Sequence, residues 1–178
     1  MDRQDQHQAF EKHVFLSEIE MQSRFAASAA KRLVISVEHY DPIEIWSAIQ
    51  SILIAAGNVS KILWPPRKTS VPRGAMLREL LDVDESNPLS DRNFRNHFEH
   101  YDERIEDWFA SKKSAVYVDP IIGPPTAIMR SFPENVHRGY DPTTQTLTFR
   151  GESMDLVSIL RALDEIRQKC RSINRPSE

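Results

Sequence analysis

The segment from Asp41 to Pro66 places the strongest constraint on how this chain can fold. Asp41, Pro42 and Glu44 match an N-cap, a first-turn proline and a capping-box acid. Apolar residues then recur at helical spacing as a main stripe with a wider arc beside it: Ile45, Ile49, Ile52, Ala56, Val59 and Leu63, with Trp46, Leu53 and Ile54. Pro65 and Pro66 end this helix. A helix that is apolar over so much of its circumference belongs in the middle of a bundle.

Three further helices are predicted around it. A long first helix over about 8–37 has one apolar stripe: Phe15, Ile19, Ala26, Ala30, Leu33 and Val37. A short third helix over about 74–83 carries Leu77, Leu80 and Leu81. A fourth helix is capped by Asn87 and Pro88, or by Ser90 and Asp91, and runs to about residue 111. Its buried seam steps by four and three residues: Phe94, Phe98, Tyr101, Ile105 and Trp108.

The chain changes character near residue 112, where prolines and short β-favouring runs begin. We predict four strands: Ala115–Val118, Ala127–Arg130, Val136–Tyr140 and Gln145–Phe149. The last two flank Asp141-Pro142-Thr143-Thr144, a turn sequence that favours a hairpin. Ser153 is then predicted to cap a final helix with a stripe that includes Cys170: Leu156, Ile159, Leu160, Leu163, Ile166 and Cys170.

These elements predict a mainly α fold, a four- to five-helix bundle with a small antiparallel β element between the fourth and last helices. Residues 1–112 form the bundle, and residues 113–178 add the strands and a C-terminal helix that packs on it. A chain of 178 residues fits a single domain of this kind.

Composition narrows the classes of function. With 40% hydrophobic and 28% charged residues the chain is typical of globular proteins, and its net charge of −3 excludes a global basic field for nucleic acid. The single Cys170, expected to be a buried and inert thiol, cannot form an intramolecular disulfide, which favours a reducing compartment. The first twenty residues are rich in charge, and the longest clearly apolar run is Ile52–Ala56. We therefore expect a cytoplasmic protein without a membrane partner.

A local basic segment follows the second helix. Lys61, Arg67, Lys68 and Arg73 give +4 between residues 61 and 75, with no acid among them. Charge runs are commonly solvated surface, so one interpretation is an ordinary exposed loop. The other is a phosphate-binding patch.

The fourth helix carries the residues with the most chemistry. Its face away from the seam gathers amide, imidazole and guanidinium groups: Arg92, Asn93, Asn96, His97 and His100. One interpretation is a hydrated face that bonds to the helix start or to a neighbouring helix. A zinc or iron site would use His97 and His100, but the chain offers no matching second pair. A third interpretation is a site for proton transfer and phosphate binding.

Arg92-Asn93-Phe94-Arg95-Asn96-His97 and Arg95-Asn96-His97-Phe98-Glu99-His100 each place a histidine five residues after an arginine. This pattern resembles the Arg-x(4 to 6)-His signature of the HEPN superfamily of small α-helical domains. The second segment is similar to an Arg-Asn-x-x-Glu-His form of that signature, and we prefer it. The chain departs from the commoner pattern because Glu99 and Asp102, not tyrosines, stand two residues after the histidines.

The resemblance implies a metal-independent endoribonuclease or an inactive relative, without a cofactor, in a toxin–antitoxin or phage-defence setting. It assigns the catalytic roles to Arg95, Asn96 and His100, or to Arg92 and His97 in the other register. It also implies a homodimer that shares one site, RNA or a nucleotide as ligand, and an antitoxin protein as partner. The rival hypothesis is a noncatalytic helical module for dimerisation and partner binding. A weaker third hypothesis is a small-ligand carrier built on the proline-rich C-terminal region.

Overall fold

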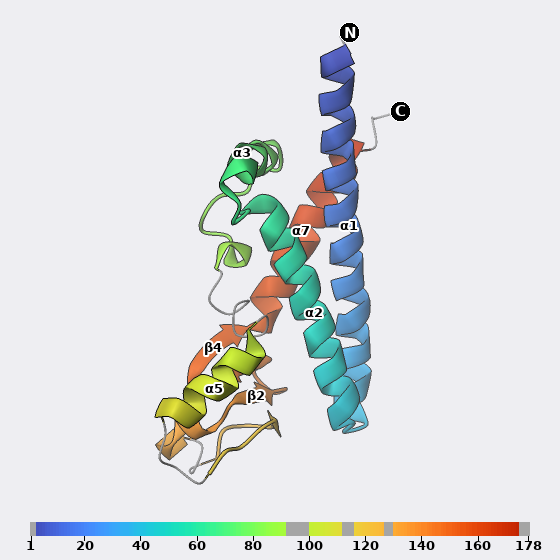
Figure 1. The fold of residues 1–178 in the computed structure, drawn as a ribbon. Helices are drawn as coiled ribbons and strands as arrows, with labels where there is room; N and C mark the ends of the chain where they lie inside the picture. Colours follow the sequence, from blue (N-terminus) through green and yellow to red (C-terminus); the bar gives the residue numbers. More distant parts are fainter. Residues whose placement is uncertain (1–2, 92–99, 112–115, 127–129, 175–178) are drawn as a thin grey trace. The chain divides into compact units, whose positions relative to one another are not determined.

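The computed structural model describes residues 3–91, 100–111, 116–126 and 130–174. The chain divides into two compact units. The first unit combines Met1–Ser90 with the C-terminal segment Ile159–Glu178, and the second unit is Asp91–Ser158. Within the described residues the fold is mainly α, with a small sheet that follows the helix Tyr101–Ser111 (Figure 1). The predicted fold class is therefore confirmed.

The first unit is built on a helical hairpin. Helix α1 (Arg3–Glu38) packs along α2 (Pro42–Leu63), and Figure 1 shows the two running side by side. The predicted main stripe of α2 is buried, and α1 covers it with a row of its own: Leu16, Ile19, Ala26, Ala29 and Leu33. Ile54 was expected to widen the buried arc, but it is exposed. It lies nine positions after Ile45, so its side chain points to the opposite side of the helix axis.

Both ends of α2 follow from the sequence. The Asp41 carboxylate accepts hydrogen bonds from the backbone N–H groups of Ile43 and Glu44, both at 3.1 Å. Glu44 closes no capping box and instead accepts a 2.9 Å bond from Arg32 of α1. The helix ends at Leu63, just before the two prolines, as predicted.

Helix α2 has the length and composition to cross a membrane, the only such case among the residues described here. Of its apolar window, 56% is buried inside the protein. Core helices of globular proteins combine the same features, so we interpret α2 as a core helix.

The segment after α2 folds back on the end of that helix. A 3₁₀ turn (Lys68–Ser70) leads into α3 (Val71–Leu80). Helix α3 begins earlier than the predicted residue 74 because Pro72 stands in its first turn, a position where proline is favoured. A Cβ atom at Gly74 would lie 2.5 Å from Pro65 Cδ and 2.7 Å from the Leu63 carbonyl oxygen. Only glycine allows this close approach. A second 3₁₀ turn, Pro88–Ser90, closes the segment.

Helix α1 is also longer than predicted, because it begins near Arg3 and not near residue 8. The apolar period identifies only the part of a helix that packs, and residues 3–11 are exposed. Helix α7 (Leu156–Asn174) ends the described chain. As predicted, Cys170 lies buried on its core stripe. Burial, reinforced by the charge of Glu20, raises the pKa of this thiol to about 12, so it stays protonated and unreactive.

The second unit contains α5 (Tyr101–Ser111), a 3₁₀ turn (Pro133–Asn135) and a four-stranded sheet in the order β1-β2-β3-β4. The strands are β1 (Ile121–Ile122), β2 (Arg138–Asp141), β3 (Thr146–Phe149) and β4 (Glu152–Asp155). Strand β1 pairs with β2 in parallel, and the other pairs are antiparallel. The β2–β3 hairpin confirms the prediction from the Asp-Pro-Thr-Thr turn.

Three predictions for this region need correction. Ser153 does not cap α7 but lies in β4, because Arg150 and Gly151, at φ of 48° and 87°, make a tight turn that continues the sheet. Asp155 caps the helix instead and accepts a 2.9 Å bond from the Val157 N–H.

The other two concern the predicted strands before β2. In 127–130, Arg130 belongs to a helical turn and its N–H donates to the Thr126 carbonyl at 3.0 Å, while 127–129 lie outside the described residues. Of Ala115–Val118, residue 115 lies outside the described residues. The segment contributes an isolated parallel bridge between Val118 and Val136 rather than a strand.

The cap of α2 can be tested by two substitutions of one residue. We expect Asp41→Ala to lower the free energy of unfolding by about 0.5–2 kcal/mol, because two helix N–H groups lose their acceptor. Asp41→Asn keeps a side-chain oxygen in the same place and should cost much less. Chemical denaturation monitored by circular dichroism measures both, and equal losses would mean that capping is not the role of Asp41.

Candidate functional site

The predicted catalytic residues are only partly within the described structure. Arg92, Arg95, Asn96 and His97 lie outside the described residues. The predicted caps of the fourth helix are described: the Asn87 side chain accepts the Leu89 N–H at 3.0 Å, but it begins the 3₁₀ turn Pro88–Ser90, and the described helix begins only at Tyr101. His100 is described, and it stands immediately before α5. Its carbonyl oxygen accepts the Arg104 N–H at 3.1 Å, which is the first bond of that helix.

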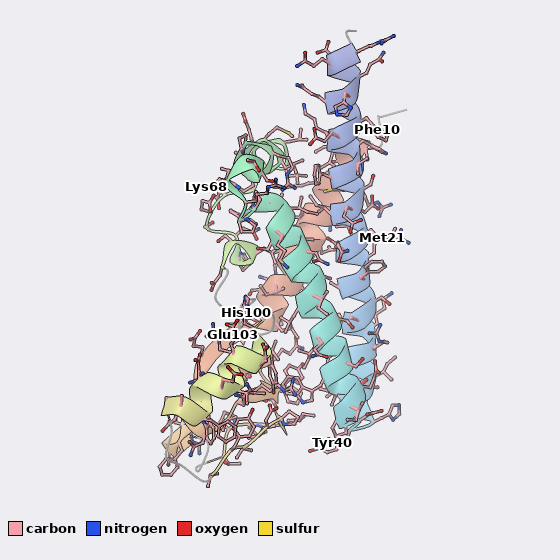
Figure 2. All side chains as sticks on the ribbon, viewed as in Figure 1. Phe10, Met21, Tyr40, Lys68, His100 and Glu103 are labelled. Atoms are coloured by element: carbon pink, nitrogen blue, oxygen red, sulfur yellow. The ribbon has the colours of Figure 1, made fainter. Side chains whose placement is uncertain are left out.

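The His100 side chain is half exposed and lies against a carboxylate (Figure 2). Its Nδ1 atom is 3.4 Å from Oε1 of Glu103, one helical turn further on. A carboxylate beside one imidazole nitrogen orients the ring and favours the tautomer that carries a proton on that nitrogen. Nε2 is then the nitrogen that can accept a proton from a ligand. This pair has the elements of a general base and its orienting group.

Tyr101, the next residue, begins a polar network inside the second unit. Its hydroxyl donates a 2.6 Å hydrogen bond to Oδ2 of Asp119, and Nε of Arg138 donates to Oδ1 of the same carboxylate at 2.8 Å. The Arg138 guanidinium also stacks over the Tyr101 ring, 4.8 Å from its centroid. The Asp119 side chain is only 11% exposed. This carboxylate therefore joins α5 to β2 through two strong bonds.

An aromatic cluster packs beside this network. His137 is fully buried, and its ring centroid lies 4.9 Å from that of Tyr101, 5.3 Å from that of Tyr117 and 4.7 Å from that of Phe149. Trp108 of α5 packs on Tyr117 at 4.9 Å and donates its indole N–H to the Glu134 carbonyl at 3.0 Å. These contacts anchor α5 at Tyr101, the residue that follows His100, and again at Trp108 two turns later.

The tyrosines of this cluster hold their protons firmly. Burial, then the hydrogen bond to Asp119, raises the pKa of Tyr101 far above its usual value near 10. Burial and the Asp119 charge also raise the pKa of Tyr117. Both phenols therefore act as hydrogen-bond donors at neutral pH and not as bases. We conclude that the network positions α5 through protonated phenols.

The predicted phosphate-binding residues all belong to the first unit. Lys61 lies near the end of α2, and Arg67 and Lys68 lie in the turn that follows; all three are exposed. Arg73 is different, because its guanidinium stacks over the ring of Phe15 at 4.3 Å. Partial burial lowers the pKa of Arg73, partly offset by Glu11. Arg73 therefore helps α3 pack on α1, and Lys61, Arg67 and Lys68 are the exposed cations of the predicted patch.

A groove of about 210 Å³ runs between α1 and α7 in the first unit. Small or apolar side chains line most of it, together with one carboxylate: Ser23, Ala26, Ala27, Ala30, Leu160, Leu163 and Asp164. The Asp164 carboxylate already accepts bonds from Arg167 and Gln168, which lower its pKa. It is therefore poorly placed to bind a ligand cation.

Several residues of the site escaped the sequence analysis. Asp119 and Arg138 follow no periodic pattern and meet Tyr101 only through the tertiary fold. Glu103 offered a weak signal, because residues three apart on a helix are neighbours. Across the described ranges, no group of three or more His, Cys, Asp or Glu side chains could hold a metal ion.

Comparisons of this chain with known protein families, with curated proteins and with solved structures find no match.

The Tyr101–Asp119 bond predicts a pH-dependent stability. Tyr101→Phe should cost about 1–3 kcal/mol at pH 7, because a buried charge loses a donor. The raised pKa of Tyr101 means that the unfolded state releases this proton first as pH rises above about 10, so the wild type loses stability there. The variant should lose less over the same range. Urea denaturation at pH 7 and between pH 10 and 11 measures this difference.

Tyr40→Phe is the matched control at pH 7, because the Tyr40 side chain is exposed in the turn after α1. An equal loss of stability in both variants would contradict the role given to the Asp119 bond.

Proposed function

We propose that the protein is a HEPN-like RNA- or nucleotide-binding protein, and that His100 transfers protons in metal-independent cleavage of bound RNA. The observation that carries the proposal is the half-exposed imidazole of His100 with Nδ1 oriented by the Glu103 carboxylate. Support from the sequence comes from Arg95, Asn96 and the alternative pair Arg92 and His97.

The chemistry needs few groups. The RNA 2′-oxygen attacks the adjacent phosphorus and gives its proton to Nε2 of His100, while the bond from phosphorus to the 5′-oxygen breaks. The 5′-oxygen takes a proton from an acid, either His97 or His100 of a second copy. The products are a 2′,3′-cyclic phosphate and a 5′-hydroxyl. An arginine fork, Arg95 or Arg92, would bind the phosphate oxygens and offset the charge that develops there.

The exposed cations Lys61, Arg67 and Lys68 would add affinity without sequence preference, because each phosphate contact releases a counterion. We further propose a homodimer, an antitoxin as protein partner, and a cytoplasmic setting of toxin–antitoxin or phage defence. The inert, buried thiol of Cys170 is compatible with a reducing compartment.

RNA binding predicts a change in salt dependence. Replacing Arg67 and Lys68 with alanine should weaken binding to all sequences alike. It should also reduce the slope of log K against log salt by about one unit for each lost phosphate contact. Fluorescence anisotropy of a labelled single-stranded RNA at several salt concentrations measures the slope. Arg161→Ala, which removes an exposed cation of α7, is the control, and an unchanged slope in the double variant would make the basic segment an ordinary surface loop.

Cleavage predicts a strong dependence on one histidine. His100→Ala should reduce the rate by about 10²- to 10⁴-fold, the usual contribution of a positioned histidine. His97→Ala should do less if Arg95–His100 is the correct register, and His39→Ala, at an exposed position after α1, should have no effect. Activity should persist in a chelator and leave a cyclic phosphate, which gel electrophoresis of end-labelled RNA detects.

The cleavage proposal fails if protein free of contaminating nuclease cuts no RNA, or cuts it equally well without both histidines. The polar residues of 92–100 would then form an interface, and the noncatalytic dimerisation and partner-binding module would be the better account.

A further inference from the structure

Helix α1 has a second apolar face that its own unit does not cover. Five large side chains keep between 42% and 65% of their surface exposed: Phe10, Val14, Met21, Phe25 and Ile35. At 100° per residue they fall within an arc of about 80°. Their arc lies opposite the fully buried Ile19 and Ala26, which face α2. Figure 2 marks Phe10 and Met21 on the side of α1 away from α2.

The first turns of the same helix also lack cover. Residues 3–11 of α1 are all exposed, although they continue the helix. Isolated helical turns are marginal in water, and most helices in proteins are held by packing of an apolar face. Phe10 lies in this stretch and begins the exposed face, so a partner that covers the face would also stabilise the uncovered turns.

We propose that α1 packs antiparallel against α1 of a second copy of this chain. This inference names the contact surface of the homodimer proposed above, and it holds whether or not the protein binds RNA. Val14, Met21, Ser28 and Ile35 repeat every seven residues, the spacing of a helix seam. Reversing the second helix about a point between residues 22 and 23 places Phe10 opposite Ile35 of the partner copy. It also places Ser17 opposite Ser28, where two small side chains allow close contact.

The area of the face suits a dimer. The five exposed side chains present apolar surface on the order of 500 Å² per copy, over about 37 Å of helix from Phe10 to Ile35. A standard interface buries about 800 Å² per partner, and about two thirds of a homodimer interface is apolar. The face therefore supplies the apolar share that one stable self-contact needs, and it falls in the upper part of the range of about 300–600 Å² for the largest apolar patch of a monomer, a patch that is often functional.

Charge decides the direction of the second helix. Acidic residues flank the N-terminal half of the face, where Glu11, Glu18 and Glu20 lie, whereas Arg24 and Lys31 flank the C-terminal half. A parallel pair would place Arg24 beside Arg24 and Lys31 beside Lys31 of the partner, which repel. An antiparallel pair places Glu20 of each copy near Arg24 of the other, so the flanking charges attract.

Light scattering after size exclusion tests the contact. The wild type should be a dimer at about 10–100 μM, and Phe25→Glu should convert it to a monomer without lowering its helical content, because Phe25 is exposed within its own chain. Ile54→Glu, which places the same charge at an exposed site of α2, should remain a dimer. A monomeric wild type overturns the proposal, and so does a dimer that Phe25→Glu leaves intact. A monomeric wild type destabilised by Phe25→Glu would mean that the face packs within its own chain.

Cysteine cross-linking tests the direction. Ser17→Cys and Ser28→Cys, oxidised separately, should form few intermolecular disulfides, whereas an equal mixture should give the mixed disulfide, at least tenfold above either alone. The native Cys170 is buried, and Ser47→Cys, at an exposed position of α2, measures random cross-linking. Each variant cross-linking mainly to itself would mean a parallel pair and would overturn the antiparallel arrangement. Cross-linking of the mixture no greater than with Ser47→Cys would overturn the contact itself.

Discussion

Burial of α2 is the constraint on which the first unit depends. Ile45, Ile49, Ile52 and Val59 are fully buried, and each contributes about 1.5–3 kcal/mol relative to an exposed side chain. The Asp41 cap and the prolines after Leu63 fix where this apolar segment begins and ends. Helix α1 covers one side of it, and α3 folds against its end. The buried row of α1, which alternates large residues such as Ile19 and Leu33 with Ala26 and Ala29, packs along this apolar helix.

The second unit is organised differently, around a carboxylate and an aromatic cluster. Asp119 binds both Tyr101 and Arg138, so two short bonds hold the start of α5 against β2. The buried ring of His137 fills the space beside them. This arrangement holds the start of α5 immediately after His100, whose side chain is half exposed.

Local chemistry made much of the fold predictable. The α2 cap, its proline stop and the Asp-Pro-Thr-Thr hairpin are encoded within a few neighbouring residues, so the sequence specified them well. The wrong prediction of the cap of α7 came from two local signals that compete in the same segment. Ser153 has the character of a helix cap, but the turn at Arg150 and Gly151 carries it into β4. The Tyr101–Asp119–Arg138 network could not be predicted, because its members are separated by 18 and 19 residues and meet only in the folded chain.

The proposal that RNA phosphate binds at His100 is tested most directly by histidine NMR. The chain has six histidines, whose ring Cε1–H signals can be assigned by substitution. Titration with a short RNA that carries 2′-methoxy groups and cannot be cleaved should shift the His100 signal strongly. The signal of His137, buried in the aromatic cluster, should change little. RNA that binds while the His100 signal stays unchanged would contradict the account.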